Sequence, residues 1–308
     1  MKIVYVLHGL AAGGTEAFVL NVVSNLDKEK YDITFILAVD DNGKTHQYHE
    51  DYAREMGIEI YRTCDLDSIK KWILHYRKLK ELLLQKGPFD IIHCNMDMFN
   101  GINLLAAKRV GIPIRICHSH ISESQYQTNF MKLCIVRIYR FAMRILIKHN
   151  ATLMLGCSKS ANQYMYGNNK KSIVLYNGIQ INKFKRQKTN NTEINKKRIM
   201  TVGRMTAPKN PEFIYQVILE LSRIRKDFYF QWVGDGTVRK EYEERSQKDH
   251  LDQLIQFMGN RNDVNKIMWE NQYFLLPSIN EGFGIALIEA QAAGLHCFCL
   301  LYTSRLYG

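Results

Sequence analysis

Short apolar segments alternate with amphipathic helical segments along almost the whole chain, and this alternation limits the possible folds more than any other feature. In the first half, strands are predicted at residues 3–7, 32–39, 90–94 and 114–117, and helices at residues 16–26, 68–85 and 101–110. Strands that alternate with helices form a parallel sheet covered by helices on both faces. We therefore predict an α/β fold. In the helix at residues 68–85, the face expected to be buried contains Ile69, Trp72, Ile73, Tyr76, Leu79 and Leu83.

A polar segment at residues 182–197 interrupts the alternation and contains almost no side chain that a core could bury. After it, strands are predicted at residues 198–202, 228–233, 254–258, 273–276 and 297–301, and helices at residues 211–225, 237–248, 262–270 and 285–293. We therefore expect two doubly wound, Rossmann-like domains, residues 1–181 and 198–308, joined by a linker at residues 182–197. Ligands of such sheets bind at the carboxyl ends of the strands, so the site is expected in a cleft between the domains.

The net charge and the cysteines limit the partners and the compartment. The chain of 308 residues has a formal net charge of +12, which suits nucleic acid, an anionic membrane surface or a phosphorylated substrate. Its seven cysteines include no Cys-x-x-Cys pair, which argues against a zinc or thioredoxin-like site and favours a reducing compartment. No segment of about 18 consecutive apolar residues is present, so we expect no membrane-spanning helix and a cytoplasmic protein.

Two loops that follow predicted strands carry residues suited to a diphosphate. Gly14 lies in the first of them, within Gly-Gly-Thr-Glu at residues 13–16, at the start of a predicted helix. Glycine lets the backbone approach a ligand, and a helix N-terminus offers N–H groups to an anion, although an ordinary tight turn explains the same residues. In the second loop, Arg204 and Lys209 lie five residues apart after the strand at residues 198–202. Two such cations can neutralise a pyrophosphate leaving group.

The most specific motif is a pair of glutamates, Glu281 and Glu289, at the start of a predicted helix. Between them, Gly282, Phe283 and Gly284 lead into the helix, whose first N–H groups can face a diphosphate. The first carboxylate can accept hydrogen bonds from the hydroxyl groups of a sugar, and the second can bind the diol of a ribose.

Together with motifs elsewhere in the chain, these residues resemble the retaining glycosyltransferase family 4, which has the GT-B fold. The resemblance extends from residue 1 to about residue 295 and is closest to bacterial capsular and exopolysaccharide transferases. Each motif alone is modest, but their order and spacing are specific. The motifs are Gly-Gly-Thr-Glu at residues 13–16, Phe-Asp-Ile-Ile-His at 89–93, Ile-Cys-His-Ser-His at 116–120, Tyr-Asn-Gly-Ile at 176–179, Val-Gly-Arg at 202–204 with Lys209, and the two glutamates.

The resemblance implies a role for each residue of the second domain. Arg204 and Lys209 would hold the diphosphate of the donor, while Glu281 and Glu289 would hold the transferred sugar and the ribose. Because the two cations neutralise the leaving group, neither a metal ion nor another cofactor is expected.

The resemblance also implies that a histidine of the first domain contacts the sugar near its reacting carbon. His118 is the first candidate, and His120 is a close alternative because the His-x-His sequence can be aligned in two ways. Either residue could instead be a hydrogen-bonded histidine at the end of a strand. His93 is expected to be structural.

An Asp-x-Asp sequence at Asp65 and Asp67 resembles the metal-binding signature of another glycosyltransferase fold. Here it precedes a predicted helix, where acidic residues cap the helix and complement its dipole. We favour the capping role over a metal site.

A predicted helix at residues 131–148 carries the basic residues Arg137, Arg140, Arg144 and Lys148 on one stripe of an otherwise apolar surface. Such a stripe is either the solvated edge of a buried helix or a surface that binds anionic lipid headgroups. The second interpretation predicts a peripheral protein at the inner face of the plasma membrane, where a lipid-linked acceptor would be found.

The sequence departs from the family after Leu295. His296 stands where the family has a proline, and residues 297–308 no longer resemble it. The second domain has about 110 residues against about 180 in the first, although the two halves of such a protein are usually similar in size. We therefore expect a truncated second domain, which could leave this chain inactive.

The sequence thus predicts a transferase that moves a hexose or N-acetylhexosamine from a nucleoside diphosphate sugar, with UDP as the expected nucleotide. The expected acceptor is a glycan or a lipid-linked glycan in surface polysaccharide synthesis. One alternative is a sugar-nucleotide epimerase of the same fold, which the pair of glutamates and the Gly-Gly-Thr-Glu loop disfavour. Another is a basic nucleic-acid-binding protein, but the chain lacks a recognition motif, so no nucleic acid is expected as a partner.

Overall fold

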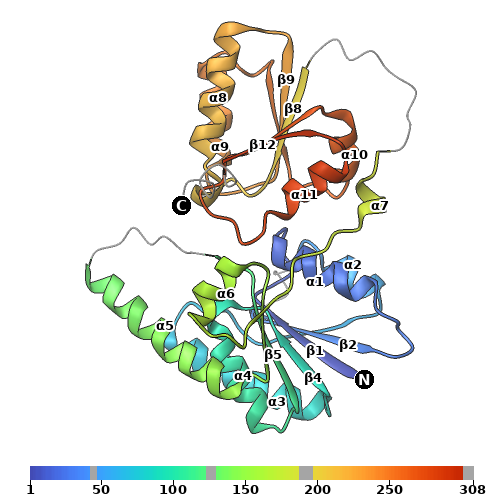
Figure 1. The fold of residues 1–308 in the computed structure, drawn as a ribbon, viewed down its shortest axis with the longest axis vertical. Coiled ribbons are helices and arrows are strands. Elements are labelled where there is room, and N and C mark those ends of the chain that lie inside the picture. Colours follow the sequence, from blue (N-terminus) through green and yellow to red (C-terminus); the bar gives the residue numbers. More distant parts are fainter. Residues whose placement is uncertain (42–46, 123–129, 187–196, 301–308) are drawn as a thin grey trace. The chain divides into compact units, whose positions relative to one another are not determined.

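The computed structural model describes residues 1–41, 47–122, 130–186 and 197–300. The chain divides into two compact units, Met1–Gly178 and Ile179–Gly308, each with its own sheet (Figure 1). Within the described residues, none of the helices has the length and apolar character needed to cross a membrane. The predicted α/β fold with parallel sheets is confirmed.

The first unit contains a parallel sheet of seven strands in the order β3-β2-β1-β4-β5-β6-β7. Its strands are β1 (Lys2–Leu7), β2 (Asp32–Leu37), β3 (Glu59–Arg62), β4 (Ile91–Cys94), β5 (Ile114–Ser119), β6 (Leu153–Gly156) and β7 (Ile173–Val174). Its helices are α1 (Gly14–Ser24), α2 (Glu50–Glu55), α3 (Ile69–Lys86), α4 (Asn100–Arg109), α5 (Phe130–Asn150) and α6 (Lys159–Tyr166), with a 3₁₀ turn η1 (Asp97–Phe99). The sequence did not predict α2, β3, β6, α6 and β7, which are two to eight residues long. Short elements are the hardest to identify from the spacing of apolar residues, although some of equal length were found.

One core in the first unit is formed by one face of the sheet and the helices α3, α4, α5 and α6. The predicted buried face of α3 was partly wrong, because Ile69 and Ile73 are 70% and 59% exposed. His75 is buried with Leu79 and Leu83 instead. Both ring nitrogens of His75 have hydrogen-bond partners: Nδ1 lies 2.7 Å from Thr63 Oγ1, and Nε2 lies 2.9 Å from Asn103 Oδ1. These bonds offset the cost of burying a polar ring in the core.

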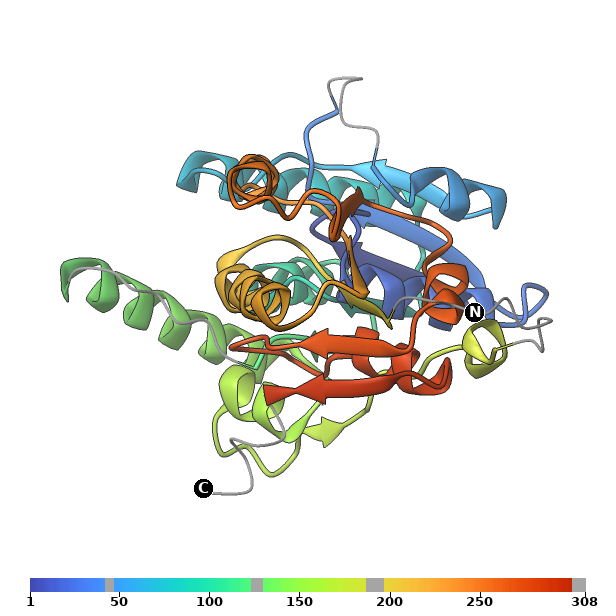
Figure 2. The same ribbon diagram turned by 90° about the horizontal axis from the view of Figure 1, so that it is seen from above.

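The second unit contains a parallel sheet of five strands in the order β10-β9-β8-β11-β12. Its strands are β8 (Lys197–Val202), β9 (Phe228–Val233), β10 (Ile255–Gly259), β11 (Tyr273–Leu276) and β12 (His296–Cys299). Its helices are α7 (Ile181–Phe184), α8 (Pro211–Ile224), α9 (Arg239–Lys248), α10 (Val264–Glu270) and α11 (Ile285–Ala292), with a 3₁₀ turn η2 (Ala207–Lys209). Figure 2 shows β11 and β12 side by side at one edge of this sheet.

Two cores cover the two faces of the second sheet. Alternate residues of β9 face opposite ways, so Phe228, Phe230 and Trp232 pack with α8 and α9. Val233 packs on the other face with α7, α10 and α11. The sheet is therefore buried on both faces, as expected for parallel strands.

The predicted linker at residues 182–197 begins with ordered structure. Residues 182–184 belong to α7, and Phe184 is buried in the core beside α10 and α11. The indole nitrogen of Trp269 donates a hydrogen bond of 2.6 Å to the carbonyl oxygen of Phe184. One aromatic residue thus anchors a segment whose composition is otherwise polar. Residues 187–196 of this linker, and residues 301–308 of the predicted truncated end, lie outside the described part of the chain.

Asn100, at the start of α4, joins the ends of β4 and β5. Its Oδ1 accepts a hydrogen bond of 2.7 Å from the backbone N–H of Met96, and its Nδ2 donates one of 3.0 Å to the carbonyl of Cys94. The same Nδ2 lies 3.4 Å from the carbonyl oxygen of His118. Because Asn100 is fully buried, these backbone groups cannot be satisfied by bulk water if its amide is removed.

We expect Asn100→Ala to lower the free energy of unfolding of the first unit by about 2–4 kcal/mol, since it leaves a buried donor and a buried acceptor without partners. Urea denaturation of the purified protein measures this loss. Asn168→Ala is the matched control, because Asn168 is exposed in the same unit, and it should change stability by less than about 0.5 kcal/mol. Equal effects of the two substitutions would show that Asn100 does not hold the strand ends together.

Candidate functional site

The loops that follow β8 and β9 approach each other closely in the second unit. Gly234, just after β9, has a φ of 132°, a conformation that favours glycine. A Cβ atom on Gly234 would collide with the carbonyl oxygen of Gly203, just after β8. The absence of a side chain therefore lets the two loops pack together, with Arg204 exposed at the carboxyl end of β8.

A second pair of loops brings Lys209 and Glu281 together. The ammonium group of Lys209 and the carboxylate of Glu281 form an ion pair, although the two residues are 72 positions apart in the sequence. Ser278 Oγ donates a hydrogen bond of 2.8 Å to the same oxygen of Glu281. The loops themselves are tied by a bond of 2.9 Å from the N–H of Ile279 to the carbonyl of Pro208. The lysine and the glutamate are thus held at the carboxyl ends of β8 and β11.

The start of α11 lies directly after these residues. Gly284 is the N-cap residue and has a left-handed φ of 79°. The first N–H groups of a helix lack intrahelical partners and attract an anion. Gly282 and Phe283 form the connection between Glu281 and this helix. The second unit therefore places two cations and a helix start near neighbouring strand ends, which is chemistry suited to a diphosphate.

Glu289 lies in the second turn of α11. Burial raises the pKa of Glu289 to about 7, and Lys183 of α7 opposes this rise through its positive charge. Its carboxyl group therefore changes charge near neutral pH. As an anion it can accept hydrogen bonds from a diol.

Three histidines cluster at the ends of β4 and β5 in the first unit. His93 Nε2 and His118 Nδ1 share a hydrogen bond of 3.2 Å, and the two rings are stacked at 5.3 Å. The rings of His118 and His120 have centroids 4.2 Å apart. Phe18 of α1 packs against both of them, at 5.1 Å and 5.3 Å. Burial lowers the pKa of His93 to about 3 and that of His120 to about 4, and the pKa of His118 is also far below its usual range. All three rings are therefore neutral at pH 7.

Asn95 determines which nitrogen of His120 carries the proton. Its Nδ2 donates to the carbonyl of His93 at 3.1 Å, so its Oδ1 is the acceptor for His120 Nε2 at 2.9 Å. His120 Nε2 is therefore protonated and Nδ1 is a bare acceptor. Within the described part of the chain, His120 Nδ1 and His118 Nε2 are buried without a hydrogen-bond partner. Buried polar atoms of this kind are rare and suit a bound ligand or water molecule.

Gly14 was predicted at the start of a helix, and it is the first residue of α1. The carboxylate of Glu16 lies so close to Gly13 that a Cβ atom there would collide with it. The N-terminus of α1 therefore already has an acidic group of the chain beside it. An external anion at this helix would compete with Glu16.

The Asp-x-Asp sequence has partners within the protein. Asp67 and Asp40 each form an ion pair of 3.0 Å with Lys71. The backbone N–H of Asp65 donates to Asp40 Oδ1 at 3.4 Å. Neither aspartate caps α3, because Ser68 is the N-cap residue and accepts a hydrogen bond from the N–H of Lys71. In the described residues, no three His, Cys, Asp or Glu side chains are grouped to hold a metal ion.

The four basic residues predicted on one stripe of α5 have different surroundings. Arg137 and Lys148 are exposed. Arg140 lies over the ring of Tyr164 at 5.1 Å, and Arg144 donates to the carbonyl oxygens of Tyr164 and Met165 at 2.5 Å and 3.3 Å. Two of the four therefore contact α6 and are only partly exposed to solvent.

Sequence reasoning missed three polar residues at these sites. Ser278 binds Glu281, and Asn95 orients His120, as described above. Asp97, just after β4, has a φ of 51°, and burial raises its pKa to about 6. Ser278 and Asn95 could have been found, because each lies within two residues of a strand end where polar residues gather. The position of Asp97 depends on a backbone conformation that its sequence does not show.

Comparison with known proteins identifies the family. Residues 12–183 match the family model described as Glycosyltransferase Family 4, and residues 196–300 match the model described as Glycosyl transferases group 1. The first match alone covers more than half of the chain. This chain belongs to glycosyltransferase family 4.

Relatives of this glycosyltransferase agree with that assignment. It is 26% identical to EpsF of Bacillus subtilis, named as a glycosyltransferase, over 96% of this chain and 78% of EpsF. It is 27% identical, over the same shares of both chains, to an Escherichia coli protein named UDP-Gal:alpha-D-GlcNAc-diphosphoundecaprenol alpha-1,3-galactosyltransferase. The crystal structure of Anabaena HepE in complex with UDP-glucose has a TM-score of 0.76 and 16% identity, over 97% of this chain and 80% of HepE. The fold of the glycosyltransferase is GT-B.

The raised pKa of Glu289 predicts how stability depends on pH. The folded pKa of about 7 exceeds the ordinary value of 4.5, so the folded glycosyltransferase holds this proton more tightly than the unfolded chain. The resulting stability is present below pH 4.5 and is lost as the pH rises through 7. Glu289→Gln keeps a neutral group at all pH values. Its melting temperature should therefore exceed that of the parent by a margin that grows by about 5–10 °C from pH 5 to pH 8. A constant margin, measured by calorimetry, would contradict the raised pKa.

Proposed function

We propose that this glycosyltransferase transfers a hexose or N-acetylhexosamine from UDP to a glycan or lipid-linked acceptor in surface polysaccharide synthesis. The observation that carries the proposal is the grouping of Arg204, the Lys209–Glu281 pair and the start of α11 at the ends of neighbouring strands. The name of the E. coli relative, which specifies a UDP-sugar and a diphosphoundecaprenol acceptor, supports it. The complex of HepE with UDP-glucose supports the choice of nucleotide. The proposed place of the reaction is the inner face of the plasma membrane, because that acceptor is lipid-linked.

The donor roles follow from the charges of the second unit. Arg204 and Lys209 bind the diphosphate, with Lys209 exchanging Glu281 for a phosphate oxygen when the donor enters. Glu281 then accepts a hydrogen bond from a sugar hydroxyl, and Glu289 accepts from the ribose diol. The N–H groups after Gly284 add a third contact to the diphosphate.

The proposed transfer retains the configuration of the sugar. The bond between the anomeric carbon and the diphosphate breaks, and the acceptor oxygen forms the new bond on the same face. The departing phosphate oxygen takes the proton of the acceptor hydroxyl. Arg204 and Lys209 stabilise the developing negative charge, so the proposed reaction needs no metal ion.

A histidine of the first unit contacts the sugar in this proposal. His118 remains the first candidate from the family resemblance. Its Nε2 is one of two buried histidine nitrogens that lack a hydrogen-bond partner among the described residues. His120 remains the alternative, since its Nδ1 is a bare acceptor and its side chain is less buried than that of His118. Asn95 and His93 orient these rings.

Release of UDP from a UDP-sugar tests the proposed function directly. We expect release only when a lipid-linked or glycan acceptor is present, and we expect EDTA to leave the rate unchanged. Asp65→Asn should also leave it unchanged, because Asp65 lies among the Asp40 and Lys71 side chains near α3. Conversion of the UDP-sugar without acceptor would favour an epimerase, and salt-sensitive DNA binding without turnover would favour a nucleic-acid-binding protein. Loss of activity in EDTA with rescue by manganese would overturn the metal-free proposal.

Two substitutions separate the diphosphate contact from the ribose contact. Glu289→Ala should weaken binding of both UDP and uridine by about 1.5–3 kcal/mol, roughly ten- to a hundredfold. Arg204→Ala should weaken UDP binding by a similar factor but leave uridine binding unchanged, since uridine has no phosphate. Lys240→Ala, which removes an exposed cation of α9, is the control and should change neither. Calorimetric titration measures all three, and unchanged UDP affinity in both test variants would refute the assignment.

A further inference from the structure

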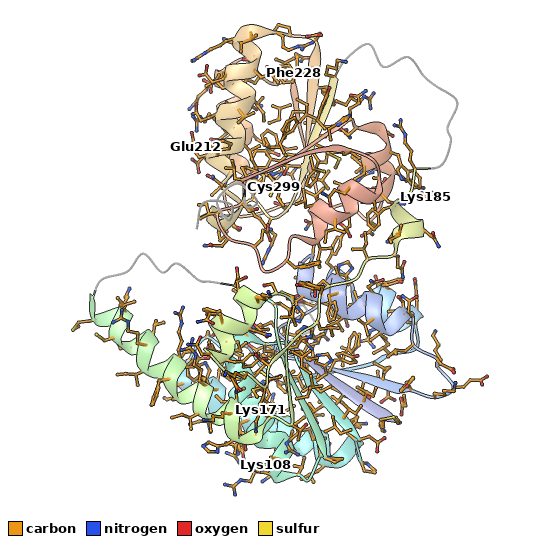
Figure 3. The ribbon with its side chains drawn as sticks, in the orientation of Figure 1. Lys108, Lys171, Lys185, Glu212, Phe228 and Cys299 are labelled. Atoms are coloured by element: carbon orange, nitrogen blue, oxygen red, sulfur yellow. The ribbon has the colours of Figure 1, made fainter. Side chains whose placement is uncertain are left out.

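Asn95 is a buried residue that connects the strand ends of the first unit with the histidine cluster. It directly follows β4 and is 4% exposed. Side chains fill the space around the sheet of this unit (Figure 3), so a buried amide must find its hydrogen-bond partners within the protein. The Nδ2 of Asn95 donates to the carbonyl of His93 at 3.1 Å, and its Oδ1 lies 2.9 Å from His120 Nε2. Its backbone N–H donates to the carbonyl of Val6 at 2.9 Å. These three bonds hold the amide in place without a ligand.

The fixed amide gives His120 a defined hydrogen-bonding character. The carbonyl of His93 requires a donor, so the Oδ1 end of Asn95 is the end that meets His120, and an amide oxygen can only accept. His120 Nε2 therefore carries the proton, and Nδ1 is an acceptor. This Nδ1 is buried and has no hydrogen-bond partner among the described residues. A hydroxyl or N–H group of a ligand would satisfy it, whereas a group that only accepts would leave it unpaired.

The other rings of the cluster do not have a character fixed in this way. The bond between His93 Nε2 and His118 Nδ1 forms equally well with the proton on either nitrogen, so it does not decide whether His118 Nε2 donates or accepts. Phe18 packs against His118 and His120 and contributes no polar group. His118 is fully buried, but His120 is partly exposed. His120 is therefore the ring that combines a defined acceptor with a partly exposed side chain.

We propose that Asn95 sets the specificity of the sugar contact, because it fixes His120 as an acceptor that admits a hydrogen-bond donor of the sugar and rejects a group without one. Asn95 does not touch the sugar; it is a positioning residue that acts through His120. A site that leaves a buried acceptor unpaired discriminates more strongly than one that loses an exposed contact. The inference rests on the proposed function, since it takes the sugar of a UDP-sugar as the ligand.

The charge of His120 decides whether this acceptor exists. Burial lowers the pKa of His120 to about 4. The titratable rings around it, His93 and His118, also have lowered pKa values and are neutral at pH 7. A protonated His120 would carry N–H groups on both nitrogens and could not accept. A carboxylate at position 95 would favour that protonated form, whereas the neutral amide of Asn95 does not.

Two replacements of Asn95 test the proposal through the ratio of UDP-sugar affinity to UDP affinity. This ratio isolates the sugar contact, because the diphosphate and ribose contacts are common to both ligands. Calorimetric titration with UDP-glucose, UDP-galactose and UDP-N-acetylglucosamine measures it. We expect Asn95→Leu to lower the ratio about tenfold at all pH values, because His120 is then free to carry its proton on Nδ1.

Asn95→Asp should behave differently, because a carboxylate still accepts from His120 Nε2. At about pH 8 the ring stays neutral, so the ratio should match that of the parent. At about pH 5 the carboxylate should keep His120 charged, and the ratio should fall about tenfold, while that of the parent changes little. Side-chain ¹⁵N spectra of His120 report the position of its proton directly in each protein.

Asn103→Leu is the matched control. Asn103 of α4 holds His75 of α3 through the same kind of bond, at 2.9 Å, and both residues are buried. This substitution should lower the melting temperature as Asn95→Leu does, because each removes a buried amide. It should leave the ratio unchanged, since His75 is outside the histidine cluster.

Monodeoxyfluoro analogues of the three UDP-sugars test the specificity itself. Fluorine cannot donate a hydrogen bond, so the analogue substituted at the contacted hydroxyl should bind the parent at least tenfold more weakly than the unmodified UDP-sugar. Asn95→Leu should lose most of this discrimination, and Asn103→Leu should keep it.

Three results would overturn the proposal while the proposed function stands: ratios that are equal in the parent and in both Asn95 variants, ¹⁵N spectra that place the proton of His120 on Nδ1 in the parent, or an equal loss in Asn95→Leu and Asn103→Leu. In each case the parent still binds UDP-sugars and releases UDP with an acceptor. If the parent neither binds nor turns over any UDP-sugar, the proposed function fails and this inference fails with it.

Discussion

The parallel pairing of β8 with β9 on one side and β11 on the other is the constraint on which the candidate donor site depends. Parallel neighbours end at the same edge of a sheet, so the loops after β8 and β11 must meet there. This pairing brings Lys209 next to Glu281 across 72 positions of sequence. The ion pair neutralises two charged groups before any ligand arrives. It also holds the ammonium group of Lys209 at the carboxyl ends of β8 and β11, where we propose that the diphosphate binds.

In the first unit, the constraint is the burial of histidine side chains away from solvent. His93 and His118 are almost or fully buried, and burial keeps their rings uncharged. The hydrogen bond between them, together with the bonds of Asn95 and Asn100 to neighbouring backbone groups, satisfies most of the buried polar atoms. A neutral imidazole can accept a hydrogen bond from a hydroxyl group, whereas a charged one cannot. The burial that lowers these pKa values therefore keeps the ring nitrogens able to accept a hydrogen bond, as the proposed sugar contact requires.

Several features of the molecule were readable from the sequence because they are local. The alternation of strands and helices depends on the spacing of apolar residues, and spacing is visible without a structure. Arg204 and Lys209 lie five residues apart on one loop. Glu281 and Glu289 belong to one short motif that leads into a predicted helix. Gly14 was predicted at a helix start for the same reason, and α1 begins there. These residues could be named as candidates before their surroundings were known.

By itself, then, the sequence determined the α/β class, the two series of alternating elements and the short motifs that mark the family. The tertiary structure decided which side chains are buried and which ones contact each other. Phe184 anchors a segment of polar composition because a pocket beside α10 and α11 buries it. Arg140 and Arg144, predicted on a basic stripe that was either a solvated edge or a lipid-binding surface, contact α6 because that helix packs beside α5. The reason is physical: periodicity depends on neighbours in the chain, whereas burial and pairing depend on elements that only the fold brings together.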